Sequence, residues 1–277
     1  MLDLRTDSGI SDSFSGSGRK VAPTTDSAEQ KVLAISYSNS SHNLRHAAAG
    51  TAWVLCFAYM LAEMFTAAAW STPYSFARDS ISSLGVTTCE VGSCSPMHDV
   101  MNSSFVALGA LTLIGALFLH RHIRSGREKK WILSLAVIIA ISTAATGLFP
   151  ANDGTFVHWT AVLPGFVARH VVLALIAWHL WHEKRIVALW SALCALVGVV
   201  GAILMLAQTL HFGLGERLAL YPMPTWMAVT GTAVLCALAR RTVLRRFDFR
   251  VPFVFRMPKP FQVTPPPTEG VAPLRAT

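Results

Sequence analysis

Charged residues are scarce in this chain. Asp, Glu, Lys and Arg make up 14% of its 277 residues and hydrophobic residues 53%, whereas about 25% of an average soluble domain is charged. The composition therefore excludes an ordinary soluble domain and indicates a membrane protein. A helix of about 20 apolar residues crosses a hydrocarbon core. Six such segments occur, near residues 47–70, 101–120, 131–149, 160–181, 186–208 and 221–239.

The segments between these spans are too short for a folded soluble domain. We therefore expect an all-α polytopic membrane protein, a bundle of six transmembrane helices over residues 46–246. Residues 1–45 are polar and Ser-rich and residues 247–277 are Pro-rich, so both are predicted to be disordered tails. The start of the chain lacks the short apolar core and cleavage site of a signal peptide. The first helix is thus expected to direct insertion.

Basic residues are nearly missing from every second connection between spans. They cluster before the first span, between the second and third, between the fourth and fifth, and after the sixth. The positive-inside rule places these sides in the cytoplasm. Both termini are then cytoplasmic, the loops 71–100, 150–159 and 209–220 face outward, and the expected location is the plasma membrane. The net charge of +8 is assigned to anionic lipid headgroups and not to nucleic acid.

The sequence contains no GxSxG, no phosphate-binding glycine loop and no CxxCH, so no cofactor is expected. Three histidines, His98, His158 and His211, lie on the predicted outer side. With a carboxylate such as Asp153 or Glu216 they would resemble a catalytic zinc site, but none of the three belongs to an HxxxH or HExxH that would place two ligands on one helix face. Alternatively, His158 handles a proton or has a structural role.

The five cysteines form two groups, one in a predicted outer loop and one within the predicted spans. Cys89 and Cys94 share the long outer loop, where an oxidising compartment favours a disulfide between them. The alternative is two free thiols, and a zinc pair is disfavoured because no two further ligands lie nearby. Cys56, Cys194 and Cys236 lie within spans and are expected to be packing residues.

Only two of the 23 Lys and Arg residues fall in the predicted outer loops. They are Arg78, beside Asp79, and Arg217, beside Glu216. The acidic neighbour lowers the cost of placing each arginine near hydrocarbon. Both arginines are therefore candidate donors to a ligand, and the alternative is that they anchor helix ends at the interface.

Two ionisable residues lie deep in the predicted spans. Glu63 is about seven residues from the outer end of the first helix, and Arg169 is about nine residues into the fourth from the same side. At a rise of about 1.5 Å per residue their depths agree within a few ångströms. Because either residue is costly unpaired in a membrane, we predict a Glu63–Arg169 ion pair.

Four motifs follow one another along the chain: "DSISSLG" (79–85), "MNSSFVALGALTLIGALFL" (101–119), "GLFPANDGTFVHWTAVLPGF" (147–166) and "GLGERLALYPMPTW" (213–226). In this order they resemble the prokaryotic membrane family called domain of unknown function 998, over about residues 45–245. The resemblance implies a six-helix membrane protein and no particular activity.

The resemblance also implies which positions recur in the family. In this sequence they are Ser80, Ser83, Leu84, Gly85, Asn102, Pro150, His158, Glu216, Arg217, Tyr221 and Pro222. Ser83 stands where an aspartate is common, which leaves any role of that acid open. All four motifs fall on the predicted outer side, so they are expected to surround one outward-facing polar vestibule.

Three functions fit these expectations. In the first, the vestibule binds a lipid headgroup, a small amphiphile or a partner membrane protein, or a second copy of the chain. Its predicted ligand-binding residues are Arg78, Asp79, Ser83, Asn102, His158, Glu216, Arg217 and Tyr221. The second is a lipid hydrolase or transferase, in which His158 is the base and Asp153 or Glu216 its partner. The third is a small transporter centred on Glu63 and Arg169.

Overall fold

The structure is a computed structural model that describes residues 41–89, 95–120, 126–208 and 211–248. The chain divides into two units, Met1–Leu235 and Cys236–Thr277, and the helical bundle belongs to the first. The described part of the second unit continues helix α8. The predicted tails lie outside the described residues, except for 41–45 and 247–248, which are helical.

The described residues are helical or irregular and include no strand. A helix over 41–55 and a turn at 56–57 lead into α2. The further elements are α2 (Ala58–Ala68), η1 (Ser82–Gly85), α3 (His98–Leu119), α4 (Arg127–Leu148), η3 (Ala151–Asp153), α5 (Thr155–Leu180), α6 (Arg185–Leu206), α7 (Phe212–Leu220) and α8 (Pro222–Asp248). Six helical stretches are long and apolar enough to cross a membrane, which confirms the predicted fold class.

The sixth span differs from its prediction. Residues 212–220, expected in an outer loop, form α7, and this candidate span runs from Phe212 to Val243. After α7, helix α8 begins at Pro222. Proline is tolerated in the first turn of a helix, where its missing N–H has no partner in any case. The charged pair in this segment thus lies on a helix packed against α6.

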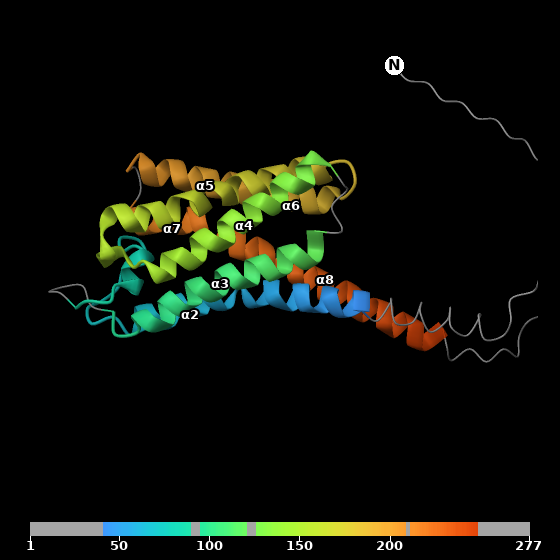
Figure 1. The fold of residues 1–277 in the computed structure, drawn as a ribbon, viewed down its shortest axis with the longest axis horizontal. Coiled ribbons are helices and arrows are strands. Elements are labelled where there is room, and N and C mark those ends of the chain that lie inside the picture. The colour runs from blue at the N-terminus through green and yellow to red at the C-terminus, as the bar shows by residue number, and fades with distance from the viewer. Residues whose placement is uncertain (1–40, 90–94, 121–125, 209–210, 249–277) are drawn as a thin grey trace, which may run out of the picture. The chain divides into compact units, whose positions relative to one another are not determined.

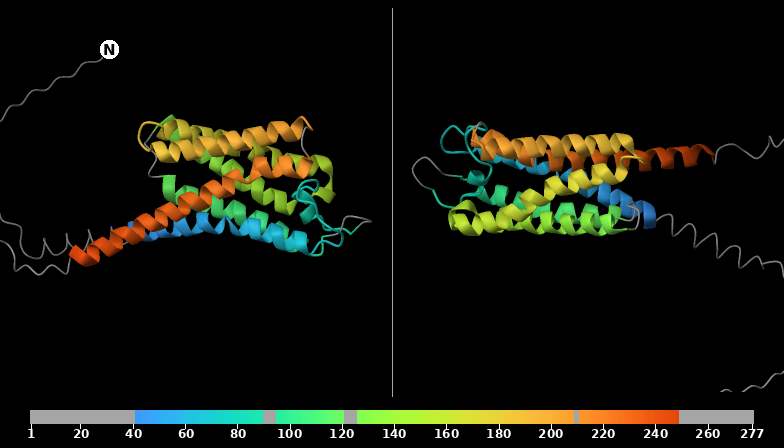
Figure 2. Two further views of the ribbon diagram at one scale, coloured as in Figure 1. Left: turned by 180° about the vertical axis from the view of Figure 1, so that it is seen from behind. Right: turned by 90° about the horizontal axis from the view of Figure 1, so that it is seen from above.

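Consecutive helices pack side by side through the bundle: α2 with α3, α3 with α4, α4 with α5, and α5 with α6 (Figures 1 and 2). Close approach depends on small residues. A Cβ on Gly109 of α3 would lie 2.4 Å from the Ala140 carbonyl oxygen of α4. Ser142 of α4 bonds to α5, accepting a hydrogen bond from the Gly165 N–H at 2.9 Å. Small residues and hydroxyls are typical of helix contacts in lipid.

Large apolar side chains cover the outside of the bundle. Phe156 and Ile186 are each 84% exposed, Trp178 is 80% exposed and Leu206 73%. Apolar exposure on this scale would be a liability in water. In a bilayer these side chains contact lipid, as six membrane-spanning helices require.

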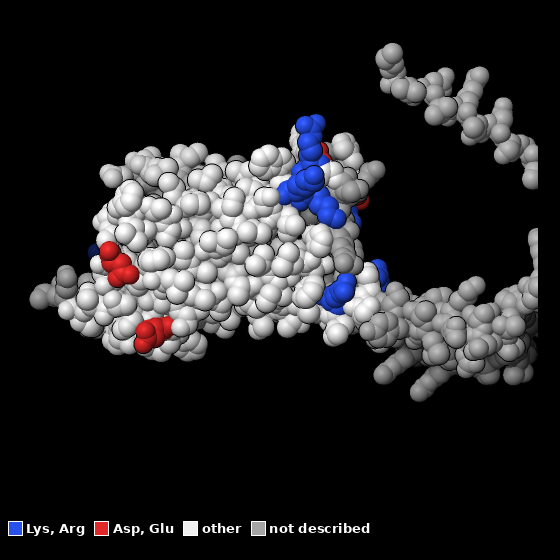
Figure 3. Space-filling model, viewed as in Figure 1, with Lys and Arg blue, Asp and Glu red and all other residues white. Residues whose placement is uncertain are grey.

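Charge is distributed unevenly along the bundle. Figure 3 shows Lys and Arg side chains gathered at one end of the drawn face and acidic side chains at the other. Arg127, Lys130, Lys184 and Arg185 are exposed where α4 and α6 begin. The loop after α2 lies at the opposite end (Figure 1). This is the asymmetry on which the predicted N-in and C-in orientation rests, and that orientation stays a prediction.

The loop between α2 and α3 is fixed to the bundle around η1. The side chains of Ile81 and Leu84 are fully buried. Asn102 of α3 donates from Nδ2 to the Gly85 carbonyl at 2.9 Å, and the Ser95 hydroxyl donates to the Leu84 carbonyl at 2.6 Å. These bonds hold η1 inside the end of the bundle, where the candidate site lies.

Candidate functional site

The most extensive polar cluster surrounds Arg217 of α7. We call Glu63, Tyr74, Arg217 and Tyr221 the arginine clasp. Arg217 is 5% exposed and Glu63 0%. The Nε and Nη2 atoms of Arg217 each lie 2.9 Å from Oε1 of Glu63 on α2, and the Tyr221 hydroxyl donates to Oε2 of Glu63 at 2.9 Å. The pair thus joins two helices that are far apart in the sequence.

The predicted Glu63–Arg169 ion pair is therefore corrected, because the partner of Glu63 is Arg217. The sequence argument matched residues by depth along predicted helices and placed Arg217 in a loop. The folding of 212–220 as α7 brings its guanidinium inward to Glu63. Arg169 donates from Nε to the Gly165 carbonyl, one turn earlier on α5, at 3.0 Å.

Arg217 also holds the loop after α2. Its Nη1 donates to the carbonyls of Phe76 at 2.7 Å, Asp79 at 2.9 Å and Gly213 at 3.0 Å. Its Nη2 donates to the Tyr74 hydroxyl at 2.5 Å. Arginine has five N–H groups, and all of its nitrogens are engaged within the protein. None is left for the ligand that Arg217 was predicted to bind.

Tyr74 connects the clasp to the loop backbone. Its hydroxyl donates to the Ser80 carbonyl at 2.8 Å, and the Arg217 guanidinium lies 5.5 Å from its ring centroid, within reach of a cation–π contact. Burial raises the pKa of Tyr74 to about 12, although the adjacent positive charge of Arg217 acts to lower it. The phenol therefore stays protonated and keeps its hydrogen bond to the loop.

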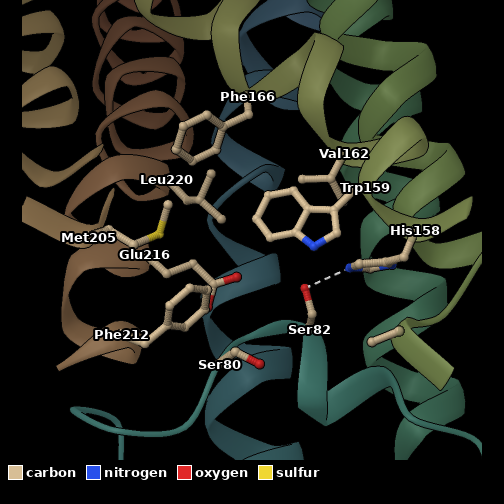
Figure 4. A pocket seen from close by; sticks show the side chains of 11 residues that line it. Ser80, Ser82, His158, Trp159, Val162, Phe166, Met205, Phe212, Glu216 and Leu220 are labelled. Atoms are coloured by element: carbon tan, nitrogen blue, oxygen red, sulfur yellow. Dashed lines mark hydrogen bonds between the residues drawn. The ribbon is translucent and has the colours of Figure 1, made fainter. Parts of the chain in front are cut away.

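A cavity of about 180 Å³ lies beside the clasp. We call it the main cavity, and Figure 4 shows the side chains around it. Apolar groups cover much of its wall and four polar side chains face it from η1, the preceding loop, α5 and α7. Its lining consists of Ser80, Ser82, Ala151, His158, Trp159, Val162, Phe166, Met205, Phe212, Glu216 and Leu220.

Ser82 and His158 are hydrogen-bonded to each other in this cavity (Figure 4). Nε2 of His158 lies 3.0 Å from the Ser82 hydroxyl, and Nδ1 lies 2.8 Å from the carbonyl oxygen of Phe149. A carbonyl can only accept, so Nδ1 carries a proton, and in the neutral imidazole Nε2 then accepts from serine. The hydrogen-bond network thus assigns the tautomer of His158.

Glu216 faces the main cavity from α7, next to the clasp residue Arg217. Its side chain is 8% exposed, and Oε2 accepts the Ile81 N–H at 2.7 Å. Within the described part of the chain, Oε1 has no hydrogen-bond donor. The carboxyl group therefore fixes the start of η1 with one oxygen and can accept from a ligand with the other.

A smaller inner cavity of about 30 Å³ shares Ser82, Val162, Glu216 and Leu220 with the main cavity. Tyr59 and Arg169 also line it. Neither the Tyr59 hydroxyl nor the Nη atoms of Arg169 hydrogen-bond to any described residue. A site of about 10–15 Å³ accommodates one water, so the inner cavity has room for water beside these donors.

Other predicted ligand residues have partners in the protein. Asp79 accepts the Ser75 N–H through Oδ2 at 2.7 Å, and the Ser83 hydroxyl donates to the Ser80 carbonyl at 2.6 Å. Asn102 bonds to Gly85, as described above, and Tyr221 belongs to the clasp. Arg78 is exposed at the surface. Apart from the exposed Arg78, the predicted set therefore divides between loop-stabilising residues and the cavity residues His158 and Glu216.

The three-histidine alternative and the predicted disulfide concern residues that the structure describes in part. The described residues contain no group of three His, Cys, Asp or Glu side chains that could hold a metal ion. His98 instead bonds to the Ser95 carbonyl, and His211 is exposed before α7. Asp153 is exposed in η3, and Nδ1 of His158 bonds to the Phe149 carbonyl instead. Cys89 is disulfide-bonded, whereas Cys94 lies outside the described residues, so their pairing stays a prediction.

Sequence reasoning missed Ser82 and Tyr74. Ser82 lies in the "DSISSLG" motif, but its histidine partner is 76 positions away, so no local spacing connected them. Tyr74 is one of only four tyrosines, and that scarcity was the one indication that its hydroxyl could have a specific place.

A family model described as "Protein of unknown function (DUF998)" matches residues 54–233. The matched range contains both the arginine clasp and the main cavity. No curated protein and no solved structure matches the chain.

Proposed function

Because this chain belongs to the DUF998 family, whose description assigns no activity, we propose a function from its geometry: the main cavity binds one small amphiphile at the outer side of the membrane. The observation that carries the proposal is the composition of the cavity wall. Ser82, His158 and Glu216 offer polar atoms to the cavity, and aromatic and aliphatic side chains cover most of the rest of its wall. A mostly apolar cavity with a few convergent polar groups is the usual form of a small-molecule site.

The charges near the cavity favour a neutral polar end on the ligand. Two carboxyl groups, Glu63 and Glu216, and two guanidinium groups, Arg169 and Arg217, lie in or beside it. With all four ionised their charges sum to zero, so an anion gains no net attraction. Oε1 of Glu216 is an acceptor, which suits a hydroxyl-bearing end such as glycerol. We therefore propose an uncharged, hydroxyl-bearing amphiphile.

The arginine clasp supports binding by fixing one wall of the cavity. It ties the loop after α2 to α2 and α7, and Glu216 ties the start of η1 to α7. A site held in one conformation before binding avoids the entropy cost of ordering a loop around the ligand. The clasp is thus a scaffold for the cavity in this proposal.

The side of the membrane follows from charge. The basic ends of α4 and α6 lie opposite to the loop after α2 (Figures 1 and 3), and the positive-inside rule assigns basic ends to the cytoplasm. The cavity then opens outward, in the plasma membrane. Membrane lipids are the partners that this placement implies.

The test is a titration of the detergent-purified chain with monododecanoylglycerol, followed by native mass spectrometry. Val162→Phe introduces a ring where the main and inner cavities meet. The affinity of the Val162→Phe variant for monododecanoylglycerol should fall about tenfold or more, the equivalent of about 1.4 kcal/mol. Val167→Phe makes the same change on the lipid-exposed side of α5, where Val167 is 53% exposed, and should bind as the unmodified chain does. Equal affinity of a folded Val162→Phe variant would refute the proposal.

A further inference from the structure

The geometry of Ser82 and His158 points to a reaction in the main cavity. We propose that Ser82 is a nucleophile and His158 its general base in the hydrolysis of a carboxylic ester carried by the bound amphiphile. This inference rests on the proposed binding function and adds a chemical step to it. It also replaces the arrangement expected from sequence, in which Asp153 or Glu216 was the partner of His158.

The hydrogen bonds have the direction that this chemistry needs. Since the Phe149 carbonyl must accept the Nδ1 proton, Nε2 of the neutral His158 ring has a lone pair directed at the Ser82 hydroxyl. A serine hydroxyl is a weak nucleophile until a base within about 2.6–3.2 Å removes its proton. The observed 3.0 Å lies in that range.

A third group orients the base, as in the serine–histidine–aspartate arrangement. Here it is the backbone carbonyl of Phe149, the residue directly after α4. A carbonyl fixes the tautomer and the ring orientation, but as a neutral group it stabilises the imidazolium less than a carboxylate does. Slow turnover relative to a full triad is the expected consequence.

The nucleophile sits on a segment that is fixed on both sides. Glu216 binds the Ile81 N–H immediately before Ser82, and Asn102 binds the Gly85 carbonyl at the end of η1. Catalytic groups must be held close to their productive geometry for such chemistry to proceed. Ser82 therefore meets this condition without needing a loop to close over it.

The reaction balances with water as the only co-reactant. The Ser82 Oγ atom forms a bond to the ester carbonyl carbon while its proton moves to Nε2 of His158. The bond to the alcohol breaks, and the alcohol leaves with that proton, which gives an acyl-serine. Water then attacks the acyl carbon and passes a proton to Nε2. The acid leaves as the proton returns to Oγ.

The cavities match this sequence of steps. Ser82 lines both the main cavity, where the ester would bind, and the inner cavity, which has room for water. Trp159, Phe166 and Phe212 offer an apolar wall to the acyl part of the substrate. The substrate class is thus an uncharged acyl ester of a small alcohol, with monoacylglycerol as a representative.

The first experiment treats the detergent-purified full chain with a fluorophosphonate probe, which loses fluoride as it bonds to an activated serine. Peptide mapping should find the label on Ser82. Ser82→Ala should reduce labelling to background, and His158→Gln should slow it by about 10²-fold or more, the usual contribution of a general base. Ser104→Ala is the matched control, because that hydroxyl bonds to the Met101 carbonyl of its own helix, and it should label normally.

The second experiment measures dodecanoate release from monododecanoylglycerol, together with binding and the thermal midpoint of each variant. Ser82→Ala should keep the thermal midpoint, lower the affinity only a few-fold, about the contribution of one hydrogen bond, and lose release of the acid altogether. Binding without Ser82 labelling or Ser82-dependent release would overturn the dyad and leave the binding proposal standing. Absence of binding would instead overturn both. A His158→Gln variant that folds and hydrolyses at the original rate would also refute the proposed base.

Discussion

Glu216 and Arg217 are adjacent in the sequence and have opposite surroundings. Every nitrogen of the Arg217 guanidinium is bonded to the protein in the arginine clasp. Glu216 has one oxygen bonded to Ile81 and the other facing the main cavity. The clasp is a closed polar network, whereas the cavity keeps unused hydrogen-bonding capacity among the described residues. A buried charged group whose hydrogen-bonding capacity is fully used within the protein is best explained by a structural role. A buried charged group with spare capacity is best explained by ligand binding.

The largest expected effect comes from opening the clasp. Arg217→Met leaves Glu63 buried without its partner, which should lower the free energy of unfolding by about 3–5 kcal/mol. The measurement is unfolding by SDS titration in mixed micelles. Arg78→Met, a change at an exposed arginine, should stay within about 0.5 kcal/mol. Similar losses of unfolding free energy in both variants would show that the clasp arginine contributes no more to stability than an exposed arginine does.

A smaller change in the free energy of unfolding is expected for a tyrosine of the clasp than for Arg217, and almost none for a tyrosine of the inner cavity. Tyr221→Phe removes a hydrogen bond to the Glu63 carboxylate and should cost about 1.5–3 kcal/mol, the usual value for a bond to a charged group. Tyr59→Phe removes a hydroxyl that has no partner among the described residues and should leave stability nearly unchanged. SDS titration of both variants gives the comparison, and a costly Tyr59→Phe would show that its hydroxyl has a structural role.

Glu216→Gln should affect binding more than stability. The amide oxygen can still accept from Ile81, so the free energy of unfolding should change by less than about 1 kcal/mol. The affinity for monododecanoylglycerol should fall about fivefold in the native mass spectrometry titration, because an uncharged acceptor binds a hydroxyl more weakly. A loss of stability with unchanged affinity would show that Glu216 has a structural role, as the clasp residues do, and does not bind the ligand.

The smallest effect on stability is expected from Arg78→Cys, which tests the outward orientation. In a background with the exposed Cys236 changed to serine, the new thiol should react in intact cells with a membrane-impermeant maleimide. Reaction only after the cells are opened would place the loop after α2, and with it the main cavity, on the cytoplasmic side.

The sequence was sufficient for the six spans because apolar length alone sets them. The exception, α7, is nine residues long and contains Gly213, Gly215 and a charged pair, so its composition is typical of a loop. Gly213 in fact permits close packing, since a Cβ there would lie 2.3 Å from the Asp79 carbonyl oxygen. Helicity at this position depends on tertiary contacts that hydropathy does not report.

The sequence predicted which residues form the candidate site better than it predicted which of them contact one another. His158 and Glu216 were expected and do line the main cavity, and Glu63 was expected to have an arginine partner. Which arginine it contacts depends on how α7 packs, and a depth calculation along separate helices cannot distinguish two guanidinium groups. The pairing of Ser82 with His158 could be predicted only from the path of the loop after α2, and a single sequence has no periodic signal for that path.

The separation of Glu63 and Arg217 along the chain has a consequence for biogenesis. They are 154 positions apart, and at about 5–20 residues per second the ribosome needs roughly 8–30 s to cover that distance. During this interval the first span resides at the translocon or in the bilayer with its glutamate lacking the arginine. A chaperone or the translocon wall that shelters this carboxyl group would speed maturation, and truncated chains ending before α7 would be substrates for membrane quality control.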